Sequence, residues 1–332
     1  MARVFNHPDV PGGKWDYVFN LGGETAYSQT YEIYKLRSYQ LSETLAKECA
    51  RRGVGAYVQA STGMVYSPNR TPRKESDKLK PWTKLGKVAL EIENMLSKIP
   101  GLNLVILRLP HVYGEYDTGI IGTALCLARI HQAQNRELKW LWTAELRQNT
   151  VHVEDCARAL WHAAAWRTTH STTPLRTSSS SPTSTRRSTL SDTTPNNSTD
   201  ETPPLSTPIF NIVDHNASTQ GTLSSLITAL FPIPTSFTGT LLSHLARLNL
   251  DKIVDETNEE MLGPWAELLD AHGLQTGPLG PWLEKELLKD ADLSLDGAAF
   301  EAETGFEYQK PRFGVEEMKA VIESYRRMAW WP

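Results

Sequence analysis

The 332-residue sequence predicts an α/β fold, in which helices cover both faces of a parallel sheet and a mostly helical lobe follows. Two observations support this. Short, nearly continuous apolar runs alternate with segments whose apolar residues recur at helical spacing, which is typical of strands buried on both faces. The last third of the chain, from Thr219 to Pro332, has a mostly helical pattern.

Each predicted element has a local justification, and the helix over residues 84–97 is an example. Its apolar side chains recur at i, i+4, i+7 and i+8, which places them on one face of a helix. The strands are short, β-rich runs, the first of which ends at Gly22-Gly23. In chain order the predicted elements are strand 15–21, helix 30–52, strand 55–61, helix 84–97, strand 103–109, helices 120–134 and 153–166, and strand 209–214.

The segment from Thr168 to Pro208 interrupts this pattern. It contains 23 Ser or Thr and six Pro in 41 residues, a composition that buries too little apolar surface to offset the entropy of ordering the chain. We therefore expect a disordered insertion at 168–208, between a sheet domain at 1–167 and a region at 209–332 that holds the last strand and the helical lobe. The insertion is consistent with a regulatory loop and equally with a translated intron or an error in the gene model.

Composition excludes several classes of protein. The formal net charge is −4, and without a basic run or stripe the sequence predicts no nucleic-acid binding. No apolar run approaches the roughly 20 residues that cross a bilayer, and the N-terminus lacks the apolar core of a signal peptide. Cys49, Cys126 and Cys156 have neither metal-ligand nor disulfide spacing, which favours a reducing compartment. We therefore expect a cytoplasmic protein that binds no metal and no membrane.

The segment from Ala60 to Lys87 carries the candidate chemistry. Ser61 and Thr62 place hydroxyl groups at the end of a predicted strand, and Lys87 follows near the start of a helix. Four positions before that lysine stands Thr83. A phenol titrates near pH 10 and can be brought toward neutrality by an adjacent ammonium, whereas an alkyl hydroxyl is far less acidic. Thr83 can therefore relay or accept a hydrogen bond, but it is a poor base.

Five short motifs occur along the chain. They are DYVFNLGG at 16–23, STGMVY at 61–66, RLPHVYG at 108–114, TVHVEDCARA at 150–159, and GF at 305–306 followed by Tyr325. In this order they resemble the motifs of the extended short-chain dehydrogenases, the NAD-dependent epimerase/dehydratase family. The resemblance covers about residues 14–166 and 209–327 and implies a Rossmann-like, doubly wound sheet with an NAD or NADP cofactor.

The resemblance also implies roles for individual residues. The catalytic candidates are Thr62, Thr83 and Lys87, of which Thr62 would bond the substrate oxygen and Lys87 the nicotinamide ribose. From the sequence alone, Thr62 is equally a cap for its turn. The implied substrate is a nucleotide sugar or a related alcohol. A homodimer through helices 30–52 and 84–97 is also implied, and the apolar stripe on the second helix fits intramolecular packing equally well. Cofactor contacts are implied for Leu21, Gly22, Gly23, Ser61, Lys87, Pro110, His111 and Val112.

The chain departs from the family pattern in two places. The family has a tyrosine where this chain has Thr83, and no G-x-x-G-x-x-G turn near the N-terminus is present to hold a pyrophosphate. On this alignment the first three strands of the family are missing. A truncated gene model is then the simplest interpretation, and the strand at 15–21 is expected to form a bare sheet edge.

The reaction type follows from the turn after Thr62. Gly63 and Met64 stand where sugar-nucleotide 4,6-dehydratases place Asp and Glu, so the sequence argues against dehydration. The sequence favours an oxidoreductase or an isomerase of the epimerase type. The alternative is a non-catalytic Rossmann-like protein that binds a nucleotide or a partner.

Three histidines and two Gly-Pro-Trp triplets are further candidates for a functional role. No two of His111, His152 and His215 share metal-ligand spacing, so structural roles are expected for them. The triplets 263–265 and 280–282 are predicted to begin helices, with proline at the first position and tryptophan at the edge of the core. The alternative for the two tryptophans is stacking against a substrate ring.

Overall fold

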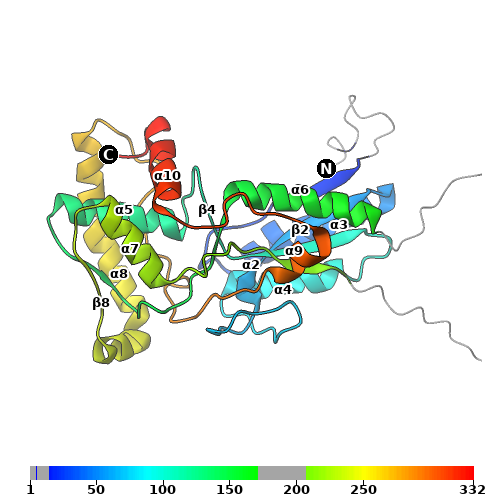
Figure 1. Ribbon diagram of the computed structural model, residues 1–332, viewed down its shortest axis with the longest axis horizontal. Coiled ribbons are helices and arrows are strands. Elements are labelled where there is room, and N and C mark those ends of the chain that lie inside the picture. Colours follow the sequence, from blue (N-terminus) through cyan, green and yellow to red (C-terminus); the bar gives the residue numbers. More distant parts are fainter. Residues whose placement is uncertain (1–4, 6–14, 171–206) are drawn as a thin grey trace, which may run out of the picture.

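The computed structural model describes residue 5, residues 15–170 and residues 207–332, and for residues 240–245 the backbone alone. The predicted insertion at 168–208 lies almost entirely outside the described residues. The predicted α/β fold is confirmed, with a sheet half beside a helical lobe (Figure 1). The elements are β1 (Tyr17–Asn20), α2 (Tyr31–Tyr34), a π-helical turn (Lys35–Tyr39), α3 (Gln40–Arg52), β2 (Ala56–Thr62), a 3-10 turn (Gly63–Val65), α4 (Lys84–Leu96), β3 (Leu104–Leu109), β4 (His111–Tyr113), α5 (Ile120–Ala133), β5 (Leu138–Trp140), β6 (Thr150–His152), α6 (Val153–Thr169), β7 (Ile209–Asn211), α7 (Gln220–Leu230), β8 (Thr235–Phe237), α8 (Thr240–Ala271), α9 (Ala298–Thr304) and α10 (Val315–Arg327).

The main sheet has the strand order β1-β2-β3-β7, and every pair in it is parallel. Tyr17 lies opposite Ala56, and Ile106 lies opposite Ile209. Because the strands are parallel, their carboxyl ends lie at one edge of the sheet, where ligands bind in open α/β folds. The candidate residues after β1, β2 and β3 therefore share that edge.

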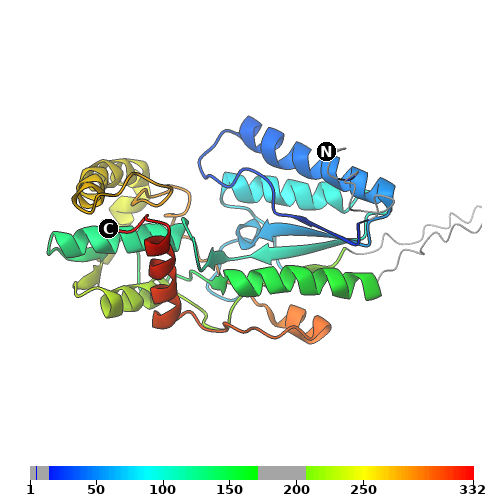
Figure 2. The same cartoon turned by 90° about the horizontal axis from the view of Figure 1, so that it is seen from above.

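Helices cover both faces of this sheet, as predicted. In β3, Val105 and Leu107 pack toward α6, whereas Leu104 and Ile106 pack toward α3 and α4. This alternation follows from the period of two along a strand. Figure 2 shows α3 and α4 on one side of the sheet and α6 on the other.

The helix predicted over residues 30–52 is present but not uniform. Thr30 caps its start by accepting a hydrogen bond from the Ile33 backbone N–H (3.4 Å), and Gly53 ends it in the left-handed conformation (φ 65°). Between these ends, α2 passes through the π-helical turn into α3. Periodicity alone predicts the extent of this helix but not the wider turn within it.

Within the described part of the chain, β1 is an edge strand that pairs with β2 alone. One of its faces carries Tyr17 and Phe19, whose rings lie 5.3 Å and 6.1 Å from the ring of Trp161 on α6. Trp161 itself is 61% exposed. The edge strand is therefore held by aromatic contacts as well as by the ladder of hydrogen bonds to β2.

The lobe is built from α5, α7, α8 and α10, which share one apolar core cluster. The predicted division of the chain at residue 167 stays a prediction. Helix α5 precedes that residue in the sequence and still contributes to the core of the lobe.

The prediction that helices begin at the two Gly-Pro-Trp triplets is wrong. Pro264 lies inside α8, where buried Met261, Trp265 and Leu269 pack into the core and offset the hydrogen bond that proline cannot make. The second triplet lies in the irregular segment between α8 and α9, with Trp282 half-exposed.

Candidate functional site

The carboxyl end of β2 forms a hydroxyl-bearing turn. Thr62 caps the 3-10 turn by accepting a hydrogen bond from the Met64 backbone N–H (3.2 Å). A hydroxyl that accepts one hydrogen bond keeps its own hydrogen for donation. The capping alternative for Thr62 is therefore observed, and it leaves the hydroxyl able to bond a substrate oxygen.

Thr83 is the N-cap of α4. Its hydroxyl accepts a hydrogen bond from the Gly86 backbone N–H (2.9 Å) and lies 3.8 Å from the Met64 sulfur, to which it can donate. The residue is 1% exposed. A side chain at position 86 would place its Cβ 2.8 Å from the Met64 carbonyl oxygen, so glycine is needed for α4 to begin this close to β2. The Thr83 hydroxyl is thus engaged in fixing the start of the helix.

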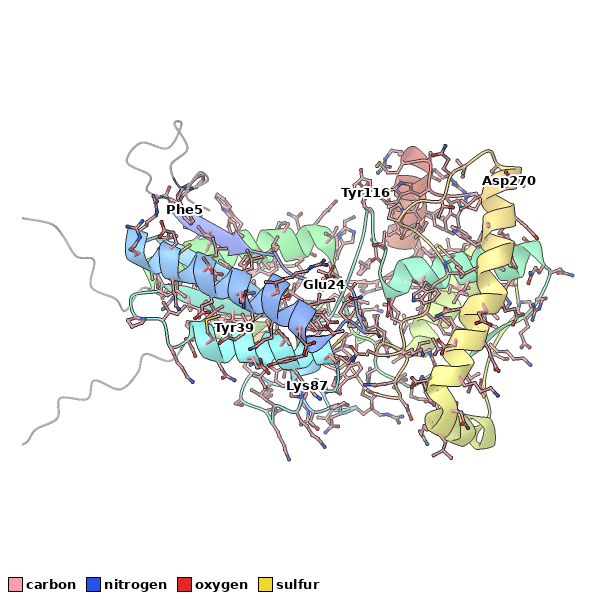
Figure 3. All side chains as sticks on the ribbon, turned by 180° about the vertical axis from the view of Figure 1, so that it is seen from behind. Phe5, Glu24, Tyr39, Lys87, Tyr116 and Asp270 are labelled. Atoms are coloured by element: carbon pink, nitrogen blue, oxygen red, sulfur yellow. The ribbon has the colours of Figure 1, made fainter. Side chains whose placement is uncertain are left out.

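Lys87 lies one turn further along α4 and is exposed. It is labelled in Figure 3, together with Glu24 from the loop after β1. The neighbouring Lys84 connects the two segments, because its ammonium donates to the Gln29 carbonyl oxygen (3.3 Å). The ammonium of Lys87 is accessible to a ligand at this end of the sheet.

The loop after β1 contains Leu21, Gly22 and Gly23, all of which are exposed. Gly23 has a φ of 148°, and a Cβ there would lie 2.9 Å from the Ser38 hydroxyl. Only glycine lets the loop pass this close to the π-helical turn. The loop therefore exposes backbone at the carboxyl end of β1, where the cofactor contact is predicted.

Ser61 belongs to a buried polar network beneath the site. Its hydroxyl donates to Glu93 (2.5 Å), and Arg108 binds both oxygens of that carboxylate (3.0 and 2.6 Å). Arg108 also donates to the Tyr66 hydroxyl (2.7 Å), which in turn donates to Asn211 (2.8 Å). The network joins β2, α4, β3 and β7. It engages the Tyr66 phenol as both an acceptor and a donor.

Pro110, His111 and Val112 lie where β3 passes into β4. Pro110 and His111 are buried, and the His111 ring contacts the Gln148 side-chain oxygen (Nε2 to Oε1, 2.7 Å). Burial lowers the pKa of His111 to about 4, so the ring is neutral at neutral pH. His111 can therefore donate or accept a hydrogen bond but carries no charge toward a ligand.

The other two histidines have local partners. His152 caps α6 by accepting from the Glu154 backbone N–H (3.3 Å), and His215 contacts Glu301 (2.9 Å). Over residues 15–170 and 207–332 there is no group of His, Cys, Asp or Glu that could hold a metal ion. Over the same ranges, no helix has the length and apolar character to cross a membrane.

Two site residues were missed by sequence reasoning. Tyr27 lies in the loop after β1, and its hydroxyl lies 3.7 Å from the Met64 sulfur that Thr83 also contacts. Glu286 comes from the C-terminal region and accepts a hydrogen bond from the Lys84 backbone N–H (3.1 Å). Burial is the main cause that raises the pKa of Tyr27, with further contributions from Tyr34, Glu286 and Glu284. No spacing rule connects residues this far apart in sequence.

A cavity of about 1140 Å³ opens between the sheet edge and the lobe. Tyr27 and His111 line it on the side of the sheet, and α5, α8 and the segment 276–288 line it on the side of the lobe. Thr62, Thr83 and Lys87 are not among its lining residues. Tyr27 therefore lines the cavity and also contacts the Met64 sulfur, which Thr83 contacts as well.

The sequence of the sheet half is similar to that of a known family. Residues 11–172 match the sequence model of the NAD dependent epimerase/dehydratase family. A search of curated protein sequences returned no match.

Solved structures share the fold over most of the chain. A complex of MoeE5 with UDP-glucose and NAD is 16% identical, with 94% of this chain and 80% of that one covered (TM-score 0.55). UDP-glucuronic acid 4-epimerase from Bacillus cereus, in complex with UDP-glucuronic acid and NAD, is 12% identical, with coverage of 94% and 76% (TM-score 0.57). The human epimerase family protein SDR39U1 with NADPH is 14% identical, with coverage of 93% and 82% (TM-score 0.58). At these identities the similarity establishes a Rossmann-like fold.

Proposed function

Since residues 11–172 match the sequence model of the NAD dependent epimerase/dehydratase family, we propose that the chain is a nicotinamide-dependent oxidoreductase that oxidises or epimerises a hydroxyl group. The proposed substrate is a nucleotide sugar or a related alcohol. One observation carries the proposal: the carboxyl ends of β1, β2 and β3 meet at one sheet edge, beside a large cavity. The nicotinamide would supply hydride transfer.

The residues at this edge suit the nicotinamide end of such a cofactor. The exposed backbone at Gly22 and Gly23 allows close approach, and the exposed Lys87 can bond a ribose. The Thr62 hydroxyl can donate to the substrate oxygen. The neutral His111 lies where the cavity meets the sheet edge.

Proton transfer needs a group other than Thr83. Its alkyl hydroxyl is a poor acid and base, and it is already bonded to Gly86 and directed at Met64. Tyr27 places a phenol against the same sulfur atom and lines the cavity. Burial raises the pKa of this phenol and keeps it protonated, so we assign Tyr27 the role of donating a hydrogen bond to the substrate oxygen.

The rival function is nucleotide binding without catalysis. The buried, capping position of Thr83 favours it, because the family's tyrosine has no counterpart at that point of the helix. A titration of the full chain with NADH, followed by its fluorescence, tests the feature that both functions share. No binding at millimolar NADH would exclude the enzyme and would exclude a nicotinamide nucleotide as the ligand of the rival.

Variants of two exposed lysines localise the binding. We expect Lys87→Gln to weaken NADH binding by at least about tenfold, since a charge-assisted hydrogen bond contributes about 1.5–3 kcal/mol. The control is Lys98→Gln, because Lys98 is also exposed but follows the far end of α4. Equal effects of the two substitutions would refute the assigned place of the ribose.

Turnover separates the two functions. Oxidation of alcohols or epimerisation of UDP-glucose by the full chain supports the enzyme, and NADH binding without turnover supports the rival. A Thr83→Tyr variant that gains turnover would identify Thr83 as the residue that limits the chemistry.

A further inference from the structure

On the side of the lobe, the cavity is lined by side chains of the lobe's apolar core. Its lining includes Ile121, Ala124 and Leu138, which are buried members of the core cluster formed by α5, α7, α8 and α10. Trp265 and Leu279 belong to the same cluster and line the same cavity. Its volume of about 1140 Å³ slightly exceeds the roughly 300–1,000 Å³ that is usual for pockets that hold a small ligand.

The cationic side chains of the lining already face acidic ones. Arg136 lies 2.9 Å from Glu260, and Lys139 lies 3.5 Å from Glu137. All four side chains are more than a third exposed, so these pairs belong to the solvent-facing rim. They place no unneutralised positive charge in the depth of the cavity.

The titratable groups further inside do not favour an anion either. Burial is the main cause that lowers the pKa of His111 and of His131, so both rings are neutral at pH 7. Glu284 also lines the cavity, and burial raises the pKa of its carboxyl. The diphosphate of a nucleotide sugar would enter here without a compensating cation, which is costly in a desolvated site.

The cavity lining does offer neutral polar atoms. Uncharged polar side chains belong to the lining, among them Thr123, Gln148 and Thr257. Their hydroxyl and amide groups can bond a hydroxyl or carbonyl oxygen of a ligand. They suit a ligand with a few oxygen atoms on an apolar body.

We infer that the cavity binds a neutral, mostly apolar alcohol or its ketone, such as an isoprenoid or polycyclic alcohol, rather than a nucleotide sugar. The apolar body would lie among the lobe residues, and its hydroxyl would point to Tyr27 and His111 at the sheet edge. The inference rests on the proposed function only for the placement of that hydroxyl. The binding preference stands on the lining alone.

Binding can be measured without cofactor or turnover. Trp140, Trp142, Trp265 and Trp282 line the cavity, so intrinsic tryptophan fluorescence of the full chain is a direct readout. The neutral probes are geraniol, borneol and 1-decanol, and the charged probe is UDP-glucose. We expect at least one neutral probe to bind at least about tenfold more tightly than UDP-glucose.

Two tryptophan variants localise the binding. Trp282 lines the cavity and is 51% exposed, so Trp282→Ala carries little risk for folding. It should weaken binding of the neutral probe about fivefold, through lost apolar contact. Trp161→Ala is the matched control, because Trp161 is 61% exposed and lies on α6 away from the cavity lining.

The outcomes separate this inference from the proposed function. Binding of a neutral alcohol that Trp282→Ala weakens and Trp161→Ala does not supports the inference, even if NADH fails to bind. Three results overturn it: no binding by any neutral probe, tighter binding of UDP-glucose that Arg136→Gln abolishes, or equal effects of the two tryptophan variants. NADH binding together with any of these leaves the proposed function in place and removes the substrate class.

Discussion

Breaking the buried ion pair between Glu93 and Arg108 should destabilise the protein more than any exposed substitution. Arg108 is 1% exposed and Glu93 3% exposed, and two hydrogen bonds join the guanidinium to the carboxylate. Replacing Glu93 by Gln leaves a buried guanidinium without its counter-charge. Removing one partner of such a pair costs about 3–5 kcal/mol of the free energy of unfolding.

The expected change is large in a denaturation experiment. With a urea m-value of about 3 kcal/mol/M, a loss of 3–5 kcal/mol lowers the midpoint by about 1–1.7 M. Far-ultraviolet circular dichroism of the full chain follows the transition. The exposed pair of Arg136 and Glu260 supplies the control, since Glu260→Gln should cost less than about 1 kcal/mol.

A double variant distinguishes the ion pair from simple packing. Glu93→Leu combined with Arg108→Met replaces both charges by apolar groups, which is often neutral or stabilising for a buried pair. We therefore expect it to recover most of the stability that Glu93→Gln loses. If Glu93→Gln changes the midpoint no more than Glu260→Gln does, the network does not connect β2, β3 and β7 as the structure implies.

Three further predictions concern the site itself. The pKa of His111 is about 4 in the folded protein and about 6.5 when unfolded, so only the unfolded chain takes up this proton as the pH falls from 6.5 to 4. Relative to His111→Gln, the wild type should therefore lose up to about 3 kcal/mol of stability across that window; a constant difference between the two urea midpoints would refute this. Tyr27→Phe should lower turnover by about a hundredfold while NADH binding is retained, and unchanged turnover would remove Tyr27 from the chemistry. Thr83→Ala should lower the free energy of unfolding by about 1 kcal/mol through loss of the helix cap, whereas Thr83→Ser should keep it; equal losses in both variants would show that the hydroxyl does not cap α4.

Local patterns in the sequence were sufficient for the elements of the sheet half. The run of apolar residues in β3 and the helical spacing in α4 each depend on neighbours a few positions apart, and both elements lie within one or two residues of the predicted bounds. The Gly-Pro-Trp triplets show the limit of such patterns. Pro264 carries a helix-start signal, yet α8 continues through it because residues on both sides pack into the lobe's core.

The features of the candidate site also fall into those that local sequence determines and those that depend on the tertiary structure. The sequence by itself determined that hydroxyls end β2, that Thr83 and Lys87 share one helix turn, and that Thr83 is no tyrosine. Only the tertiary structure decided that Tyr27 meets the Met64 sulfur, that Glu286 contacts the start of α4, and that a cavity opens among the lobe's apolar side chains. The physical reason is the sequence separation of the residues involved. Periodicity and capping are set by residues within about four positions of one another. The contacts of Tyr27, Glu286 and the cavity depend instead on how packed layers bring together segments far apart in the chain.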